Sequence, residues 1–401
     1  MIWARRPIKR IADVFLGKMI QPEPKSEADI AAPYLRAAHV QPNGQIVDVD
    51  DKTMWFRDGE LALHDLRRDD VVIVEGGAVG RSAVIREDRD GWGFQNSIVR
   101  VRPQPTLASG RYLDYALQSA LSSGEVEVAC FTATIPHFTA DKVGAFQVPA
   151  PPIGTQRAIA NYLDRETARI DTLIEEQQRL IDILRERRAA VLSSAFDTGS
   201  ATETTKVGRL LAARPSYGVL VPRYVDEADG VPFIRVGDLL NLAQKRPMLA
   251  IAPKQSDEYS RTKIVGGEVL LGVVGKMGQA VLAPQWLEGA NVARAVAVLR
   301  CQDQSVAPLL CAWLGSNNFL HQAELATSGD SIQPTLGMKD LARFDINLPI
   351  DPNAAAELAS RLAKIDTLIA EAERFIELAR ERRSALITAA VTGQIDVREM
   401  V

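Results

Sequence analysis

Cysteine and histidine are scarce in this chain of 401 residues, which contains three cysteines and four histidines. Cys130, Cys301 and Cys311 form no Cys-x-x-Cys pair. A structural zinc site needs several such ligands at short spacings, so we expect no metal site. Low cysteine content is also typical of a reduced, cytoplasmic protein, and we expect that location.

Long apolar runs are absent as well. No run approaches the roughly 20 residues that a membrane-spanning helix needs, and the basic N-terminal segment lacks the uninterrupted apolar core of a signal peptide. Lys and Arg number 47 and Asp and Glu 51, which gives a net charge of −4. Because the chain as a whole is not basic, a DNA-binding surface must come from local clustering of basic residues.

Nucleotide-binding and catalytic motifs are missing. The glycine loop at residues 75–80 has Glu75 where a dinucleotide-binding fingerprint needs its first glycine, and the loop at residues 270–277 has Met277 where a phosphate-binding loop needs Ser or Thr. Tight turns between strands explain both loops better. The chain also lacks the His-Glu-x-x-His, Gly-x-Ser-x-Gly and kinase signatures. We therefore expect no enzymatic activity from this chain alone.

A long internal repeat dominates what is present. Residues 168–195 and 363–390 align without a gap at an offset of 195 (363 minus 168), and both copies contain the segment IDTLI followed by RERR. A repeat of such long period predicts duplicated domains rather than a solenoid of short units.

Each copy has apolar residues at alternating spacings of three and four, which predicts a helix with a coiled-coil seam. The expected seam residues are Ile170, Leu173, Leu180, Leu184 and Val191 in the first copy and Ile365, Leu368, Phe375, Ala379 and Leu386 in the second. The seam is interrupted at matching places, by Gln177 opposite Ala372 in the alignment and by Arg187 opposite Arg382. Two such helices can pair antiparallel.

The ends of these helices also have sequence signals. We expect the first helix to begin near Thr155 and the second at Asp351-Pro352, where a capping Asp precedes a Pro suited to the first turn. Gly199 and Gly393 can adopt the left-handed conformation that ends a helix.

The segments before the two helices are rich in strand signals and match each other loosely. In the first segment we expect strands at residues 46–49, 71–74, 83–85 and 98–101 and a helix at residues 112–121. Residues 70–84 correspond to 268–281, and the helix corresponds to residues 309–322.

We therefore expect an α+β fold that arises from tandem duplication of a strand-rich globular domain followed by a long helix, the two long helices pairing as an antiparallel coiled coil. The expected parts are domain 1 (residues 1–151), helix 1 (152–199), domain 2 (200–350) and helix 2 (351–401).

This plan resembles the DNA-specificity subunits of type I restriction-modification systems over essentially the whole chain. The proline-rich lead-in at residues 148–152, the following QRAIANYLDRET, the two IDTLI segments and the RERR helix ends carry the resemblance. The second copy departs from it after Asp351-Pro352, because NAAAELASRL lacks the Gln-Arg step.

The resemblance implies a non-catalytic subunit in which each globular target-recognition domain reads one half of a bipartite, asymmetric site on double-stranded DNA. It implies that the helices set the gap between the halves and dock two methyltransferase subunits, and that restriction subunits join the full complex. The chain itself is expected to bind no cofactor; S-adenosylmethionine, ATP and Mg would belong to the partners, and no membrane is involved.

Base reading requires side chains that donate and accept hydrogen bonds, such as Arg for guanine and Asn or Gln for adenine. The candidates in the first domain are Arg36, Arg81, Gln95, Asn96, Thr132, Thr134 and His137. Those in the second are Arg235, Lys276, Gln279, Arg294, Ser331 and Gln333. Arg36 and Arg235 occupy equivalent positions and can instead belong to the scaffold common to both copies. Many of the others can equally be turn caps or phosphate contacts, which position a protein without specifying sequence.

The charged RERR segments have two interpretations, a solvated helix face and a docking surface for partners. For the whole chain three alternatives stay open. It can be the specificity module of another methyltransferase or restriction system, an enzyme acting on DNA with an unrecognised site, or a structural coiled-coil adaptor.

Overall fold

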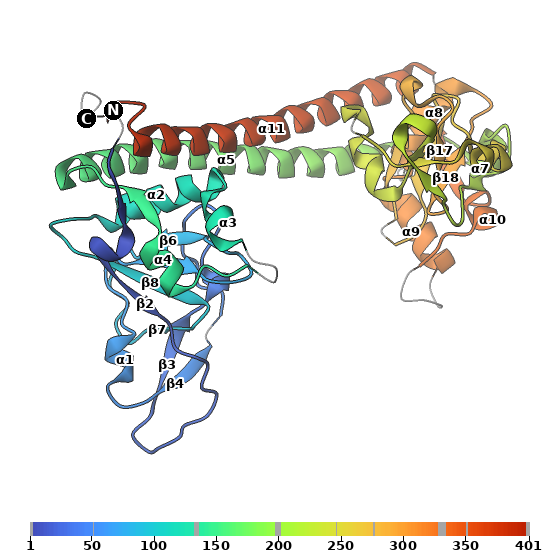
Figure 1. Ribbon diagram of the computed structural model, residues 1–401. Coiled ribbons are helices and arrows are strands. Elements are labelled where there is room, and N and C mark those ends of the chain that lie inside the picture. Colours follow the sequence, from blue (N-terminus) through green and yellow to red (C-terminus); the bar gives the residue numbers. More distant parts are fainter. Residues whose placement is uncertain are drawn as a thin grey trace. The chain divides into compact units, whose positions relative to one another are not determined.

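The computed structural model describes residues 3–50, 52–131, 136–196, 202–245, 247–275, 277–327, 334–349 and 352–397. The chain divides into two compact units: unit 1 comprises Met1–Gln177 and Arg374–Val401, and unit 2 comprises Gln178–Glu373. Each unit contains a mixed domain of strands and helices together with part of both long helices (Figure 1). Among the described residues, no helix has the length and apolar character needed to cross a membrane.

The central sheet of unit 1 has four antiparallel strands in the order β2-β8-β5-β6. They are β2 (Ala12–Leu16), β8 (Ile98–Pro103), β5 (Val71–Val74) and β6 (Ser82–Val84). β5 is buried along its whole length, because Val71 and Ile73 belong to one hydrophobic cluster and Val72 and Val74 to another. Its composition of Val and Ile suits a strand covered on both faces.

Two further sheets complete the strands of unit 1. The order β4-β3-β7 joins β4 (Thr53–Phe56) antiparallel and β7 (Gly93–Phe94) parallel to β3 (Ile30–Leu35). β1 (Arg5–Pro7) pairs antiparallel with β9 (Gln147–Pro149), so the start of the chain lies beside the segment that leads into the first long helix.

Helix α2 (Gly110–Ser122) packs against the central sheet. Its buried Tyr112, Leu113 and Leu117 share one core with strand residues such as Val71 and Val99 and with residues of both long helices, Leu163 and Ile387 among them. The domain and the adjoining helix ends therefore form one hydrophobic core. The other helices of unit 1 are α1 (Glu60–Leu63), α3 (Glu125–Cys130), α4 (Ala140–Ala145) and the 3-10 helices η1 (Ile8–Arg10) and η2 (Ala37–His39).

Unit 2 repeats this topology. Its sheets have the orders β11-β18-β15-β16, β12-β14-β13-β17 and β10-β19. The strands are β10 (Thr202–Lys206), β11 (Ser216–Tyr217), β12 (Tyr224–Val225), β13 (Val231–Ile234), β14 (Ala250–Ile251), β15 (Val269–Gly272), β16 (Ala280–Leu282), β17 (Asn291–Val292), β18 (Val296–Leu299) and β19 (Asp345–Pro349). β15 is buried throughout, as β5 is, and β13 pairs parallel with β17, as β3 does with β7. The predicted duplication is thus visible in the sheets, and β12, which pairs with β14, has no counterpart among the described residues of unit 1.

The helices of unit 2 differ from the expectation at one place. The sequence predicted one helix over residues 309–322, but the chain forms α8 (Ala307–Trp313) and α9 (Asn317–Thr327). Between them, Ser316 accepts a hydrogen bond from the backbone N–H of Phe319, and a serine that satisfies a helix start in this way favours a new helix over continuation of the old one. The remaining helices are α6 (Val207–Leu210), α7 (Pro253–Glu258), α10 (Met338–Leu341), η3 (Glu227–Asp229), η4 (Val236–Gln244), η5 (Ser260–Thr262), η6 (Gln285–Leu287) and η7 (Gln304–Val306).

The strand expected at residues 46–49 is wrong as well. Only Ile46 pairs, in an isolated bridge to Val40, and Val47 and Val49 are exposed. The intervening residues close a tight loop through backbone hydrogen bonds between Gln41 and Gln45 and from Gly44 to Gln41. Alternating apolar residues form a strand only where a partner edge is present.

The long helices are α5 (Ile153–Phe196) and α11 (Pro352–Thr392). Gly393 has φ 77°, so its predicted left-handed cap is confirmed. Gly199 and Asp351 lie outside the described residues.

The buried face of each long helix has a different phase from the predicted seam. Four residues that were expected to face inward are each at least 40% exposed: Leu173, Leu180, Leu368 and Phe375. Ile170, Leu184, Ile365 and Ala379 are buried, and Val191 and Leu386 are partly buried. The inward residues between them are Ile181 and Ile376, each following an exposed apolar neighbour. Because Leu180-Ile181 and Phe375-Ile376 are both apolar pairs, spacing alone could not select the inward member.

The polar residues that interrupt the inward-facing row of apolar residues are therefore Arg188 and Arg383, whereas Arg187 and Arg382 were expected. Within unit 1, Arg383 of α11 donates from Nε to Asp171 of α5 at 2.9 Å. Within unit 2, Arg188 of α5 donates from Nε to Asp366 of α11 at 2.7 Å. These two ion pairs join the helices within each unit.

Candidate nucleic-acid interface

Three loop segments meet at one edge of the central sheet in unit 1: the glycine loop at residues 75–81, the turn at residues 95–97 and residues 136–138. The backbone N–H of Glu75 donates to the carbonyl oxygen of Ser97 at 2.9 Å, and the N–H of Phe138 donates to the carbonyl oxygen of Glu75 at 2.8 Å. Sequence reasoning had selected candidates from all three segments, and the structure brings them together. We call this arrangement the three-segment site.

Unit 2 has an equivalent three-segment site. Val273 donates through its N–H to the carbonyl oxygen of Ala295, and Leu336 donates to that of Val273, each at 2.9 Å. The two sites therefore consist of a glycine loop, a turn before a sheet strand and a later segment, held by the same backbone hydrogen bonds in each unit.

A glycine permits the close backbone approach behind the turn in each site. A Cβ at Gly17 would lie 2.1 Å from the carbonyl oxygen of Gln95, and a Cβ at Gly218 would lie 1.8 Å from that of Val292. In both units the residue after this glycine forms a parallel bridge with the turn, Lys18 to Gln95 and Val219 to Ala293.

The candidate reading residues occupy equivalent positions of the two sites. Asn96 and Arg294 each donate through the backbone N–H to the residue after that glycine, Lys18 or Val219. Their side chains differ, although the backbone around them is the same.

The glycine loops contain a second equivalent pair. The carbonyl oxygens of Arg81 and Gln279 accept from the backbone N–H groups of Val74 and Gly272, each at 2.8 Å. Arg81 also donates from Nη1 to the carbonyl oxygen of Val40 at 3.4 Å. Arg81 and Gln279 are part-buried, whereas Arg294 is exposed. The two sites thus present different donors and acceptors from a shared framework.

Other candidates have structural roles or lie beside the site. Arg36 pairs with Asp50 and Arg235 with Asp238, so both of these arginines hold their own loops. His137 is exposed next to the glycine loop, where its ring is 3.0 Å from the Cβ position of Gly76. The candidates outside the described residues are Thr132, Thr134, Lys276, Ser331 and Gln333.

Sequence reasoning missed Lys18, which the structure places at the site. Its backbone bonds both sides of the turn, accepting from Asn96 and donating to Phe94, and its side chain pairs with Glu60. The glycine before this position, Gly17 in unit 1 and Gly218 in unit 2, could have indicated it in the sequence. It could not be interpreted there, because the glycine is needed only where the next residue forms a parallel bridge with a distant segment.

A buried carboxylate supports the central sheet in each unit. Asp70 and Glu268 are 1% and 2% exposed and pair with Arg102 and Arg300 of the neighbouring strand region. The hydrogen bonds that Arg102 donates to Asp70 raise the pKa of its guanidinium, against the opposing effect of burial. These pairs fix the strands from which the three-segment sites extend.

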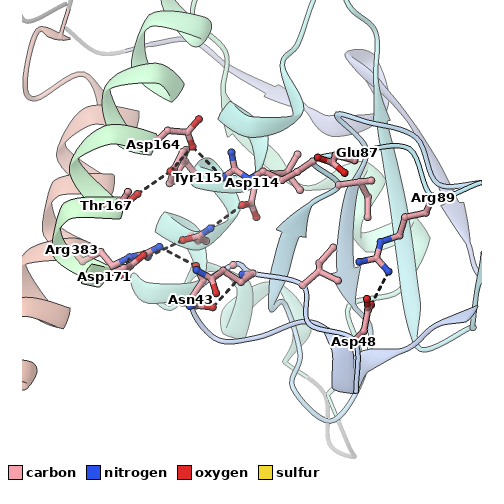
Figure 2. A pocket seen from close by; sticks show the side chains of 18 of the residues that line it. Asn43, Asp48, Glu87, Arg89, Asp114, Tyr115, Asp164, Thr167, Asp171 and Arg383 are labelled. Atoms are coloured by element: carbon pink, nitrogen blue, oxygen red, sulfur yellow. Dashed lines mark hydrogen bonds and ion pairs between the residues drawn. The ribbon is translucent and has the colours of Figure 1, made fainter. Parts of the chain in front are cut away.

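An acidic hollow lies elsewhere in unit 1 (Figure 2). A cavity of about 890 Å³ is lined by eight Asp or Glu residues and three Arg residues. Such a surface repels phosphate. Among the described residues there is also no group of three or more His, Cys, Asp or Glu side chains that could hold a metal ion.

The duplicated fold and the two equivalent sites define a class of protein with two similar domains, each presenting its own polar side chains on a shared scaffold. Residues 3–183 match the model of the type I restriction modification DNA specificity domain. These residues belong to that domain family, and the resemblance seen in the sequence is confirmed.

A relative of known identity supports the same family. The type I restriction enzyme EcoBI specificity subunit of Escherichia coli is 26% identical over 281 residues, which cover 63% of this chain. The match spans 58% of that relative's length.

Solved structures show that nearly the whole chain shares one fold with such subunits. A chain from a study of complex assembly and conformational transition of the type I R-M system has a TM-score of 0.66 and 17% identity, with 98% of both chains covered. The S subunit from M. genitalium has a TM-score of 0.52 and 16% identity, covering 97% of this chain and 96% of that one. The HsdS subunit from Thermoanaerobacter tengcongensis has a TM-score of 0.50 and 18% identity, covering 98% and 97%.

Proposed function

We propose that this chain is the DNA-specificity subunit of a type I restriction-modification complex and that it reads a bipartite, asymmetric site on double-stranded DNA. The domain of unit 1 reads one half and the domain of unit 2 reads the other. Each domain uses its three-segment site for this purpose.

The observation that carries this proposal is the replacement of side chains at equivalent backbone positions. Arg81 corresponds to Gln279 and Asn96 to Arg294, and each pair is held by matching backbone hydrogen bonds. Arg pairs with guanine, and Asn or Gln with adenine, in the major groove. Recognition of two different half-sites requires two copies of one scaffold that carry different base-reading side chains at equivalent positions.

The long helices have the role of a spacer and docking surface in this proposal. Arg185, Glu186 and Arg187 of α5 and Arg380, Glu381 and Arg382 of α11 are exposed at equivalent positions. We assign these two surfaces to two methyltransferase subunits. Restriction subunits would join the same complex.

The chain acts without chemistry of its own in this proposal. S-adenosylmethionine belongs to the methyltransferase partners, and ATP and Mg belong to the restriction partners. A specificity module of another methyltransferase or restriction system is the second candidate, because the three-segment sites would serve it equally.

Single-molecule methylation mapping tests the proposal. DNA is taken from cells that express this chain with its neighbouring methyltransferase and from cells that express the methyltransferase alone. A bipartite motif methylated on adenine only with this chain present is the expected result. The same methylation in both cultures would contradict the proposal, and methylation by the purified chain alone would show an enzyme instead.

A further inference from the structure

Arg383 has more partners than its equivalent in the other unit. Besides the ion pair with Asp171, it donates from Nη1 to the side-chain oxygen of Gln118 at 3.2 Å and from Nη2 to the carbonyl oxygen of Asn43 at 2.9 Å (Figure 2). Its side chain is 14% exposed. One guanidinium thus connects α11, α5, α2 and the loop at residues 40–46. It can do so because a guanidinium carries several N–H donors in fixed directions.

The contacts of Arg383 continue into the domain interior. Gln118 donates to Asp114 at 2.9 Å, and Asp114 accepts a second hydrogen bond from Ser82 of β6 at 2.7 Å. Asp114 is 4% exposed. A continuous hydrogen-bonded chain therefore runs from the two long helices to the central sheet.

The loop at residues 40–46 links Arg383 to the three-segment site. Its tip is held by the bond from Arg383 to Asn43, and Gly44 lies so close to Gln118 that a Cβ would be 2.4 Å from Nε2. Its base carries the carbonyl oxygen of Val40, which accepts from Arg81 of the glycine loop. A change at Arg383 therefore reaches Arg81 through one small, internally hydrogen-bonded loop.

Unit 2 keeps the ion pair but has neither a carboxylate nor an amide side chain at the positions that correspond to Asp114 and Gln118. Alignment of the helix that follows the sheet places Cys311 at the position of Asp114 and Gly315 at that of Gln118, because Leu310 and Leu314 are fully buried as Leu113 and Leu117 are. Arg188 pairs with Asp366 and lies 3.5 Å from the Cβ position of Gly315. Its side chain is 31% exposed, about twice the value for Arg383.

We propose that Arg383 is a positioning residue for DNA reading by unit 1: it fixes the loop at residues 40–46 against the long helices and thereby fixes Arg81 in the three-segment site. Arg188 has no such role in unit 2. This inference rests on the proposed function, because it concerns the reading of one half-site. A residue of a long helix would then contribute to sequence specificity in only one of the two half-sites.

Arg383→Met and its matched control Arg188→Met test this. Both remove one interhelical ion pair and keep an apolar stem of similar length. Asn96→Ala first identifies the half-site read by unit 1. Methylation mapping with the neighbouring methyltransferase then measures, for each variant, methylation of sites that carry one wrong base in either half.

The expected result for Arg383→Met is roughly tenfold more methylation of sites with a wrong base in the unit 1 half, as for loss of one positioned contact, with unchanged discrimination in the other half. Arg188→Met is expected to leave both halves unchanged. Equal changes in both halves, equal effects of the two variants, or no change with Arg383→Met would each overturn the inference.

A second measurement separates the inference from the proposed function. Amide hydrogen exchange of the purified full chain follows the N–H groups of Gln41 and Gly44, which are hydrogen-bonded within the loop, and of Val47, which donates to His39 at the base of the loop. Arg383→Met is expected to accelerate their exchange roughly tenfold, and Arg188→Met is not. Unchanged exchange overturns the inference whatever the methylation result, whereas failure of the wild-type chain to direct methylation would contradict the proposed function as well.

If Arg383→Met does not fold, Arg383→Lys replaces it. Lysine can retain the ion pair with Asp171 but lacks the fork that reaches Gln118 and Asn43 together. Faster loop exchange and relaxed reading of the unit 1 half are expected again, and wild-type values for both would overturn the inference.

Discussion

Arg383 pairs with Asp171 across the two long helices, and Arg188 and Asp366 form the same pair with the helices exchanged. Each member lies 195 residues from its equivalent (383 minus 188, and 366 minus 171). The IDTLI and RERR segments are therefore the two halves of a reciprocal contact. This explains why these segments recur, and it leaves the side chains of Arg187 and Arg382 exposed.

The two ion pairs are expected to differ in strength. Arg383→Met should lower the free energy of unfolding of unit 1 by about 2 kcal/mol, because it leaves part-buried acceptors without a donor. Arg188→Met should cost about 0.5 kcal/mol, because Asp366 is 51% exposed and water screens the pair. Urea unfolding followed by hydrogen exchange in each unit measures both, and equal costs would contradict the assignment of extra partners to Arg383.

Asp114 should make the stability of unit 1 depend on pH. Burial raises its pKa from 3.8 to about 6, against the hydrogen bonds from Ser82 and Gln118. The folded state then binds more protons than the unfolded state between these two values, so this group's contribution to stability falls as pH rises through the window and stays lost above about pH 6. The difference corresponds to about 3 kcal/mol at most.

Asp114→Asn isolates this contribution, because all other titrating groups are shared with the wild-type chain. The free energy of unfolding of the variant minus that of the wild type should increase from pH 4 to pH 6 and then level off. A difference that stays constant over this range would mean that Asp114 has an ordinary pKa.

Gly17 and Gly218 should not tolerate a side chain. Replacement of either by Ala forces a Cβ against a backbone carbonyl oxygen and should cost about 3 kcal/mol. It should also displace the turn with Asn96 or Arg294, so that Gly17→Ala impairs reading of one half-site and Gly218→Ala that of the other.

Gly154→Ala is the matched control for these glycines. No atom lies within 4 Å of its Cβ position in α5, and the change should raise stability by about 0.5 kcal/mol. Melting temperatures and methylation maps measure the three variants. Similar behaviour of all three would show that close approach of the backbone is unimportant at the turns.

Arg294 should specify sequence, whereas Arg235 should not. Arg294→Ala is expected to relax one base position of the half-site read by unit 2 by about 1–3 kcal/mol. Arg235 pairs with Asp238, so Arg235→Ala should leave base preference unchanged. If methylation mapping shows that both variants lose the base preference at the same position, the role of Arg294 is structural, like that of Arg235.

Much of the local structure was predictable because its causes are local. Runs of Val and Ile identified β5, and the helix at residues 112–121 falls within α2. The errors arose where a partner decides the outcome. Residues 46–49 have the alternation of a strand without an edge to pair with, and Ser316 starts a new helix in the middle of an apolar helical run.

By itself, the sequence determined the duplication, the two long helices and the segments that hold the polar readers, because repeats, apolar spacing and turn residues are written along the chain. The tertiary structure decided three further points: which side chain of each apolar pair faces inward, that three distant segments form one site in each unit, and that Arg383 reaches into the domain. These depend on contacts between residues far apart in sequence, and neither spacing nor composition encodes which distant atoms meet.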